Sequence, residues 1–146
     1  MTTLKFQVQL KIRKPVAEVF EAVVDPKKLS SYFLEHSSGR LEPGAKLKWK
    51  FAEMDRELDV VVDAVEKNRR ITFAWPASGG FDTRVEMTFR ELDGGDTMVQ
   101  ISESGWPDDE EGREGSHGNA GGWMHMLACL KAWLEYGINL REGGAF

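Results

Sequence analysis

The fold is decided by the stretch NAGGWMHMLACLKAWLEYG, residues 119–137. Its large apolar residues recur at helical spacing and form one stripe, made of Trp123, Met126, Leu127, Leu130, Trp133 and Leu134. A helix of this span is about 28 Å long, which is enough to cross a whole sheet. Because its indole rings need a broad apolar surface to pack against, we expect the residues upstream to supply one.

The chain upstream of this helix is predicted to form strands and two short helices. Apolar and polar residues alternate from Leu4 to Ile12, which is typical of a strand with one buried face. A short amphipathic helix is expected over residues 15–24, and a second begins at Pro26. Alternation broken by turn residues then predicts about six more antiparallel strands over residues 36–103. The fold class is therefore α+β, with a curved antiparallel sheet of about seven strands around the final helix.

The segment before the final helix is predicted to be a loop or a frayed turn over residues 105–122. Pro107 and the acids at 108–111 resemble a helix start. Glycines in the following residues oppose a stable helix: Gly112, Gly115 and Gly118. The acidic run is either a docking patch or simply a solvated loop.

Composition favours one soluble domain over residues 1–146, because 41% of the residues are hydrophobic and 29% are charged. The net charge of -5 argues against nucleic acid or an anionic membrane as the main partner. The single cysteine, Cys129, excludes an internal disulfide and fits a reducing compartment. Residues 1–13 lack the apolar block of a signal peptide, so we expect a cytoplasmic protein without membrane insertion.

Five segments in order resemble the START-like (SRPBCC) helix-grip superfamily, and within it the family of the activator of Hsp90 ATPase homologue (AHSA1-like). They are PVAEVF at 15–20, DPKKL at 25–29, EPGA at 42–45, ITFAW at 71–75, and GW at 122–123 with Leu127, Leu130-Lys131 and Leu134-Glu135. The resemblance implies a cavity between the long helix and the sheet, often used for lipid-like molecules. It also implies a link to chaperones, weakened here because the chain lacks the amino-terminal domain that eukaryotic co-chaperones use.

The large inward-facing side chains leave two possibilities open. The rings either fill the space under the helix at normal density or line an apolar pocket. If there is a pocket, the candidate ligand-binding residues are Trp49, Phe51, Trp75, Phe81, Trp123, Met126 and Leu127, with Trp106 at its mouth. Trp106 has an alternative role as a plug at the end of the core.

Few residues in this sequence suggest catalysis. Glu103 is a weak catalytic candidate: by alternation with Val99 and Ile101 it faces inward, where it would anchor a ligand. The favoured interpretation is that the strand has ended and Glu103 faces water. His125 and Cys129 share a helix face, but no further ligand stands at a matching spacing, so no metal and no cofactor are expected.

Three functions remain possible on these observations. The first is a non-enzymatic binding module for a small hydrophobic or lipid-like molecule. The alternatives are an enzyme of the cyclase or hydratase type that uses Glu103, and a stress-related or co-chaperone-like interaction domain that uses the acidic run.

Overall fold

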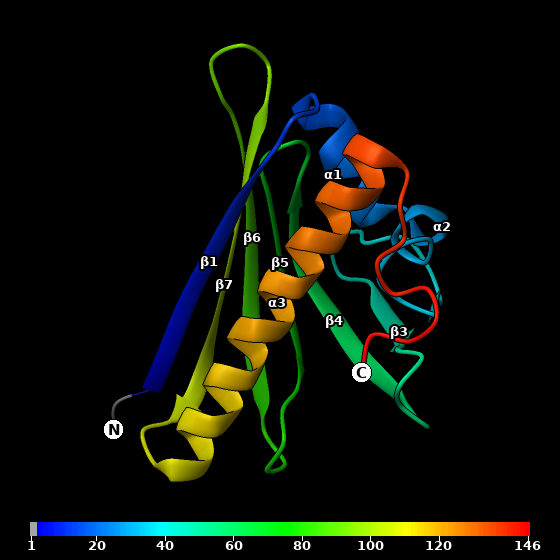
Figure 1. The fold of residues 1–146 in the computed structure, drawn as a ribbon. Coiled ribbons are helices and arrows are strands. Elements are labelled where there is room, and N and C mark those ends of the chain that lie inside the picture. The colour runs from blue at the N-terminus through cyan, green and yellow to red at the C-terminus, as the bar shows by residue number, and fades with distance from the viewer. Residues whose placement is uncertain (1–2) are drawn as a thin grey trace.

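One antiparallel sheet of seven strands forms the body of the protein in the computed structural model, which describes residues 3–146. The strands lie in the order β1-β7-β6-β5-β4-β3-β2, so the first strand pairs with the last (Figure 1). Their bounds are β1 (Thr3–Ile12), β2 (His36–Ser37), β3 (Lys46–Lys50), β4 (Glu57–Glu66), β5 (Arg70–Pro76), β6 (Asp82–Glu91) and β7 (Thr97–Pro107). The predicted number and direction of the strands are confirmed.

Three helices cover one face of this sheet: α1 (Val16–Val24), α2 (Pro26–Leu29) and α3 (Glu110–Tyr136). Asp25 caps α2 as expected, because its carboxylate accepts hydrogen bonds from the amides of Lys27 and Lys28. The α3 helix runs diagonally across the sheet and packs against β1 and β7 (Figure 1). None of the helices within residues 3–146 is long and apolar enough to span a membrane.

The α3 helix begins at Glu110, so the prediction of a loop over residues 105–122 is wrong for most of that segment. Asp109 caps the helix by accepting a hydrogen bond of 2.7 Å from the amide of Gly112. A Cβ atom at Gly112 would lie 1.8 Å from the carbonyl oxygen of Pro107, and one at Gly115 would lie 2.8 Å from Nε1 of Trp106. These two glycines let the helix lie directly on the end of β7, and that packing outweighs their low helix propensity.

A bulge at Gly105 changes which side of β7 faces the helix. Leu4 of β1 pairs with Trp106 and Lys5 pairs with Ser104, so Gly105 is the extra residue. Its φ of +122° suits glycine, and a Cβ atom there would lie 3.4 Å from the Cα atom of Thr83. As a result both Glu103 and Trp106 are buried, although the two residues are an odd number of positions apart.

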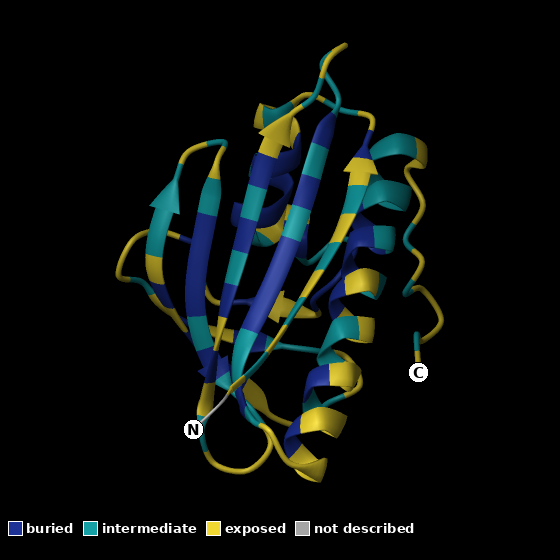
Figure 2. Cartoon of the chain, turned by 90° about the vertical axis from the view of Figure 1, so that its left-hand side faces the viewer, coloured by how far each residue is buried: buried dark blue, intermediate teal, exposed yellow. Residues whose placement is uncertain are grey.

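The space between the sheet and α3 is largely filled with side chains. Buried residues alternate along the strands and form the sheet-facing stripe of α3 (Figure 2). Trp49 and Phe73 pack edge to face with ring centroids 5.3 Å apart, and Phe73 and Trp75 do so at 5.7 Å. Trp123 is only 2% exposed, so the predicted placement of the final helix against the strands is confirmed.

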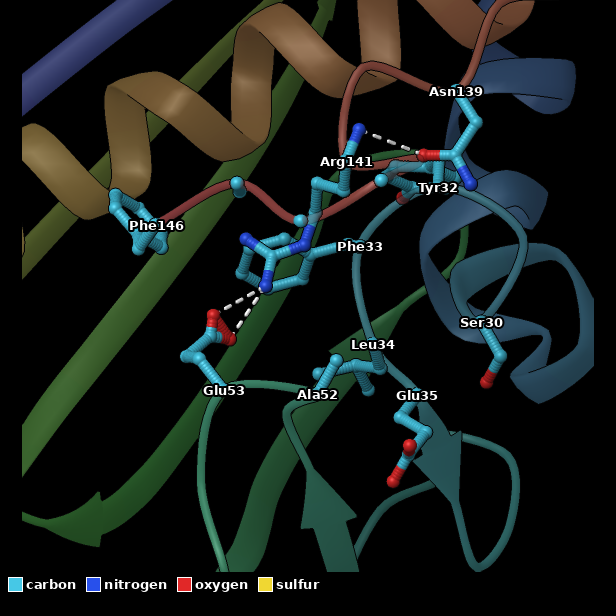
Figure 3. Close-up of a pocket in the computed structure, with 13 residues that line it drawn as sticks. Ser30, Tyr32, Phe33, Leu34, Glu35, Ala52, Glu53, Asn139, Arg141 and Phe146 are labelled. Carbon is cyan, nitrogen blue, oxygen red and sulfur yellow. Dashed lines mark hydrogen bonds and ion pairs between the residues drawn. The ribbon is translucent and has the colours of Figure 1, made fainter.

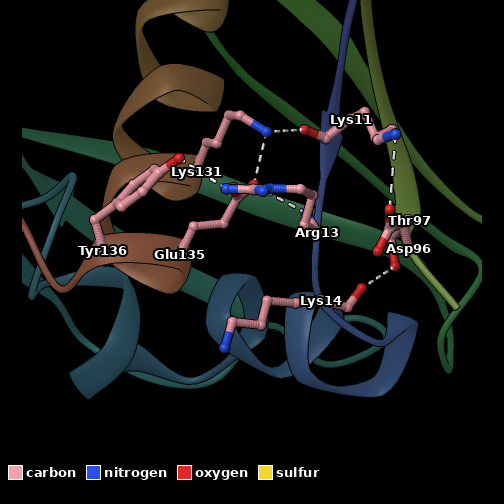
Figure 4. Close-up of polar contacts among 8 residues, drawn as sticks. All are labelled: Lys11, Arg13, Lys14, Asp96, Thr97, Lys131, Glu135 and Tyr136. Carbon is pink, nitrogen blue, oxygen red and sulfur yellow. Dashed lines mark hydrogen bonds and ion pairs between the residues drawn. The ribbon is translucent and has the colours of Figure 1, made fainter.

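A polar cluster ties the end of α3 to the end of β1 (Figure 4). The carboxylate of Glu135 accepts hydrogen bonds from the amide and Nε of Arg13, at 2.9 and 2.6 Å, and from Nζ of Lys131 at 2.6 Å. Burial raises the pKa of Glu135, but these hydrogen bonds and the neighbouring positive charge outweigh it and lower the pKa to about 2. The ionised Glu135 therefore helps hold the two ends of the fold together.

Candidate functional site

An open groove of about 280 Å³ lies beside α3 where the packed rings end. We call it the aromatic groove and define it by the residues Phe33, Phe51, Met54, Trp75, Gly122 and Trp123. They come from the segment after α2, the segment after β3, strand β5 and helix α3. Ring centroids are 5.1 Å apart for Phe33 and Phe51 and 5.2 Å apart for Trp75 and Trp123. The walls of the groove are therefore held by the same aromatic contacts that build the core.

Glu103 lies behind the wall of the aromatic groove and is 1% exposed. Its Oε1 atom accepts hydrogen bonds from Nε1 of Trp123 at 2.8 Å and from Nδ2 of Asn119 at 3.1 Å. Its Oε2 atom accepts from Nε1 of Trp75 at 2.8 Å, from Oγ1 of Thr83 at 2.5 Å and from the same Asn119 nitrogen at 3.1 Å. Both carboxylate oxygens are thus fully engaged by neutral donors.

These donors explain why a carboxylate is tolerated inside the core. Moving a carboxylate out of water is costly unless its lone pairs are satisfied. Indole and amide nitrogens donate only, and hydrogen bonds to a charged acceptor are stronger than those between neutral groups. The preferred interpretation of Glu103 from the sequence, that β7 had ended and the side chain faced water, is wrong, because β7 continues to Pro107.

The helix side of the aromatic groove includes a glycine, Gly122, that has no side chain to occupy the groove. Asn119 and Gly122 line the groove together with Trp123; Asn119 lies one helical turn before Trp123, and Gly122 lies directly before it. A Cβ atom added at Gly122 would meet no other atom within 4 Å, so no packing contact requires glycine there. Gly121 is equally unobstructed but does not line the groove. A side chain added at residue 122 would therefore begin at a position that lines the groove, whereas one at residue 121 would begin outside it.

Arg141, from the segment that follows α3, forms the rim of the groove. Figure 3 shows it beside Glu53 and Phe33 in the hollow next to the groove. Its Nη2 atom donates to both carboxylate oxygens of Glu53 at 2.5 Å. Its guanidinium lies over the rings of Phe33, Phe51 and Phe146, at 5.7, 5.9 and 5.7 Å from their centroids. A second hollow of about 420 Å³ adjoins this rim and shares Phe33, Glu53, Arg141 and Phe146 with the aromatic groove.

The structure separates the candidate ligand-binding residues into three groups. Phe51, Trp75 and Trp123 line the aromatic groove. Trp49, Met126 and Leu127 are at most 1% exposed and do not line it, so they belong to the filled core behind. Phe81 and Trp106 line a separate hollow of about 320 Å³ near the start of α3.

Trp106 fits the role of a plug better than that of a pocket mouth. It is 2% exposed and stacks on Phe6 with ring centroids 5.7 Å apart. The glycine at 115 gives its indole room beneath the first turns of α3. Trp106 therefore closes the end of the fold far along α3 from the aromatic groove.

Several groove residues were not among the sequence candidates: Phe33, Met54, Asn119, Gly122 and Arg141. Asn119 stands four residues before Trp123 on the same helix face, and this spacing could have identified it. Arg141 had no such signal, because its position depends on how the chain turns after Gly137, which ends α3 with a φ of +67°.

His125 and Cys129 lie next to each other, with Nε2 and Sγ 3.4 Å apart. Burial raises the pKa of the Cys129 thiol, so the thiolate needed for nucleophilic attack is disfavoured. Burial and the charge of Arg141 lower the pKa of His125. No cluster of three or more His, Cys, Asp or Glu side chains suited to a metal ion occurs within residues 3–146. The pair is therefore best described as a packing contact.

Sequence and structure comparisons place the chain in a known family. The model of the family "Activator of Hsp90 ATPase homolog 1-like protein" matches residues 13–135, and the chain belongs to this family. Its sheet and long carboxy-terminal helix are the helix-grip fold of the START-like superfamily, as the sequence resemblance predicted. The comparison with curated proteins finds no match.

Solved structures similar to this chain share nearly its whole fold. The protein SSP2350 from Staphylococcus saprophyticus is 30% identical, with a TM-score of 0.81, over 94% of this chain and 96% of that one. DynU16, from the dynemicin biosynthetic locus, is 29% identical with a TM-score of 0.77, over 91% of this chain but only 48% of that one. The Aha1 dimer from Colwellia psychrerythraea is 17% identical with a TM-score of 0.75, covering 92% and 98% of the two chains, and supports the fold alone.

Proposed function

We propose that this protein binds a small hydrophobic or lipid-like molecule in the aromatic groove between α3 and the sheet. The observation that carries the proposal is the groove itself: aromatic rings wall it, and one of its lining residues is a glycine at which no atom would contact a Cβ. Ligand sites in proteins are typically concave, mostly apolar and supplied with few polar groups. The groove is at the small end of their range, which favours a small ligand.

The expected affinity follows from the apolar area that the groove can cover. An aromatic ring buries roughly 150 Å² or more of surface. At about 25 cal/mol per Å² this gives about 4 kcal/mol before the costs of association. Even without those costs this free energy corresponds to a Kd of about 1 mM, so a single ring would bind more weakly than that, and tight binding requires contacts that extend into the adjoining hollow.

The hydrogen bonds of Glu103 favour binding over catalysis by this residue. A general base needs a free lone pair within reach of the proton that it removes. Both oxygens of Glu103 already accept hydrogen bonds from buried donors, and the donors Trp75, Asn119 and Trp123 stand between it and the groove. We therefore assign Glu103 the role of fixing the groove walls in position, and the cyclase or hydratase alternative loses the catalytic residue that the sequence suggested.

Replacing Gly122 by leucine tests the proposal with little risk to folding. Gly122→Leu adds a bulky side chain at a residue that lines the groove, and Gly121→Leu is the matched control because it adds the same side chain at a residue that does not. Both changes raise helix propensity by about 0.8 kcal/mol. Titration with small aromatic and aliphatic compounds, followed by tryptophan fluorescence, should show binding to the wild type and the control but not to Gly122→Leu. Equal binding to all three proteins would contradict the proposal.

The acidic residues 108–111, the candidate docking patch, form the start of α3. Asp109 caps the helix, Glu110 and Glu111 lie in its first turn, and Asp108 pairs with Arg113 at 2.7 Å. Acidic side chains are favourable at this end of a helix, so they have a structural role without any partner. A chaperone-like interaction there stays a prediction. A pull-down that gives the same partners with Glu110 and Glu111 replaced by glutamine would count against it.

A further inference from the structure

The aromatic groove has a negative charge behind its wall that no neighbouring cation cancels. The donors to Glu103 are Trp75, Thr83, Asn119 and Trp123, and none of these side chains carries a formal charge. Within residues 3–146 no lysine or arginine nitrogen lies within 4.0 Å of the Glu103 carboxylate. Since the carboxylate is 1% exposed, water screens it little. The electric field of the carboxylate therefore extends past these donors into the space on their other side.

That space is the aromatic groove, because three of the donors line it: Trp75, Asn119 and Trp123. Aromatic rings add to the negative potential, since the faces of their π-systems carry partial negative charge. The other charges at the groove nearly cancel, because Arg141 and Glu53 form an ion pair. His125 also lines the groove, and burial together with the charge of Arg141 lowers its pKa, which favours the neutral imidazole. Lys50, which donates to the carbonyls of Phe51 and Met54, is likewise paired with Glu35. Among these charged side chains, Glu103 is thus the one without an ion-pair partner.

The chain itself already places a cation against two of these rings. The guanidinium of Arg141 lies over Phe33 and Phe51, and its side chain is only 10% exposed. This contact shows that the ring faces at the rim are accessible to a cation and hold one. Figure 3 shows the guanidinium over Phe33, pointing toward Glu53.

From this charge distribution we infer that the ligand of the aromatic groove is a small organic cation of the quaternary ammonium type. The inference rests on the proposed binding function of the groove. A quaternary ammonium has an apolar shell that packs on the rings and a charge that attracts Glu103. It has no N–H groups, which matters because the lone pairs of Glu103 are already occupied. An anion would face Glu103 and would have to displace Glu53 from Arg141.

Three probes of the same shape and different charge test the inference: choline, the neutral alcohol 3,3-dimethylbutan-1-ol, and the anion 3,3-dimethylbutanoate. We expect choline to bind about 5- to 10-fold more tightly than the alcohol, in line with cation–π contacts, and the anion to bind most weakly. Isothermal titration calorimetry at low ionic strength, with all three probes in the same buffer, measures the order. Binding of choline should disappear in Gly122→Leu and persist in Gly121→Leu.

The outcomes separate this inference from the proposed function. If the alcohol binds as tightly as choline and Gly122→Leu abolishes both, the groove binds ligands and the charge preference is refuted. If the anion binds best, Arg141 recognises the ligand and the inference is likewise refuted. If neither the probes nor the compounds of the fluorescence panel bind to the wild type, the proposed function fails too.

Replacing Arg141, the arginine that lies over Phe33 and Phe51, provides an independent check. Arg141→Met should increase the affinity for choline about 2- to 5-fold, because it frees the faces of Phe33 and Phe51 and leaves the charge of Glu53 unpaired. Arg113→Met is the control, since Arg113 is a half-exposed arginine in an ion pair at the other end of α3. A loss of choline affinity in a folded Arg141→Met protein, with the control unchanged, would overturn the inference.

Discussion

Replacement of Glu103 by glutamine changes the centre of the buried polar network with almost no change in shape. A glutamine side chain keeps one acceptor oxygen and places an amide NH₂ where the second oxygen was. Whichever way the amide is turned, it faces an indole N–H: that of Trp123 at the position of Oε1, or that of Trp75 at the position of Oε2. At least one buried indole therefore loses its acceptor.

The structure sets the expected size of the effect. A buried donor without a partner costs about 1–3 kcal/mol, and the remaining hydrogen bonds weaken because their acceptor is no longer charged. Relief from burying a charge offsets part of this loss. We expect Glu103→Gln to lower the free energy of unfolding by about 2–4 kcal/mol and the Tm by about 5–15 °C. Thr83→Val, which removes one donor and keeps the carboxylate, should cost about 1 kcal/mol.

Urea denaturation followed by tryptophan fluorescence measures both variants. Glu91→Gln is the control, because Glu91 is exposed at the end of β6, and it should stay within about 0.5 kcal/mol of the wild type. If Glu103→Gln unfolds at the same urea concentration as this control, the carboxylate does not hold the indoles. The positions assigned to Trp75 and Trp123 would then have no support.

Two further predictions concern α3. Because the pKa of Glu135 falls from 4.5 to about 2 on folding, its contribution to stability is complete above pH 4.5 and is lost as the pH falls toward 2. Because Arg13 is 55% exposed, solvent screening limits this contribution to about 1–2 kcal/mol. Urea denaturation between pH 5 and pH 2 should therefore show that Glu135→Gln loses less stability than the wild type, by that amount. An identical loss in the two proteins would contradict the role assigned to Glu135. Gly115→Ala should destabilise the protein by about 1–3 kcal/mol, because its Cβ would lie 2.8 Å from Nε1 of Trp106. Gly118→Ala should stabilise it by up to about 1 kcal/mol, because a Cβ there meets no atom within 4 Å and alanine favours the helix. Thermal denaturation that ranks the two variants in the opposite order would refute the close packing of α3 on β7.

Much of the fold could be predicted from the sequence because each strand has one solvent-exposed and one buried face, which gives an alternating pattern of polar and apolar residues. Residues 3–12 show the alternation most clearly, and every predicted strand is present. The start of α3 could not be predicted in the same way. Propensity counts Gly112 and Gly115 against a helix, but the approach of Pro107 and Trp106 that requires these glycines exists only in three dimensions.

The candidate site shows the same limit of sequence reasoning. Alternation pointed Glu103 inward, and the cost of burying a carboxylate then argued against that position. The donors that offset this cost come from β5, β6 and α3, which are distant in sequence. The aromatic residues that line the groove and those that fill the core have the same pattern in the sequence, so their separation depends on the curvature of the sheet.

The indole N–H signals of the five tryptophans provide the most direct test of ligand binding in the aromatic groove. Trp75 and Trp123 line the groove, whereas Trp106 closes the far end of the fold and Trp133 does not line the groove. In ¹H–¹⁵N NMR spectra recorded during a titration with choline, the signals of Trp75 and Trp123 should shift together and saturate, and those of Trp106 and Trp133 should stay fixed. Saturable shifts at Trp106 with no change at Trp75 or Trp123 would contradict the account.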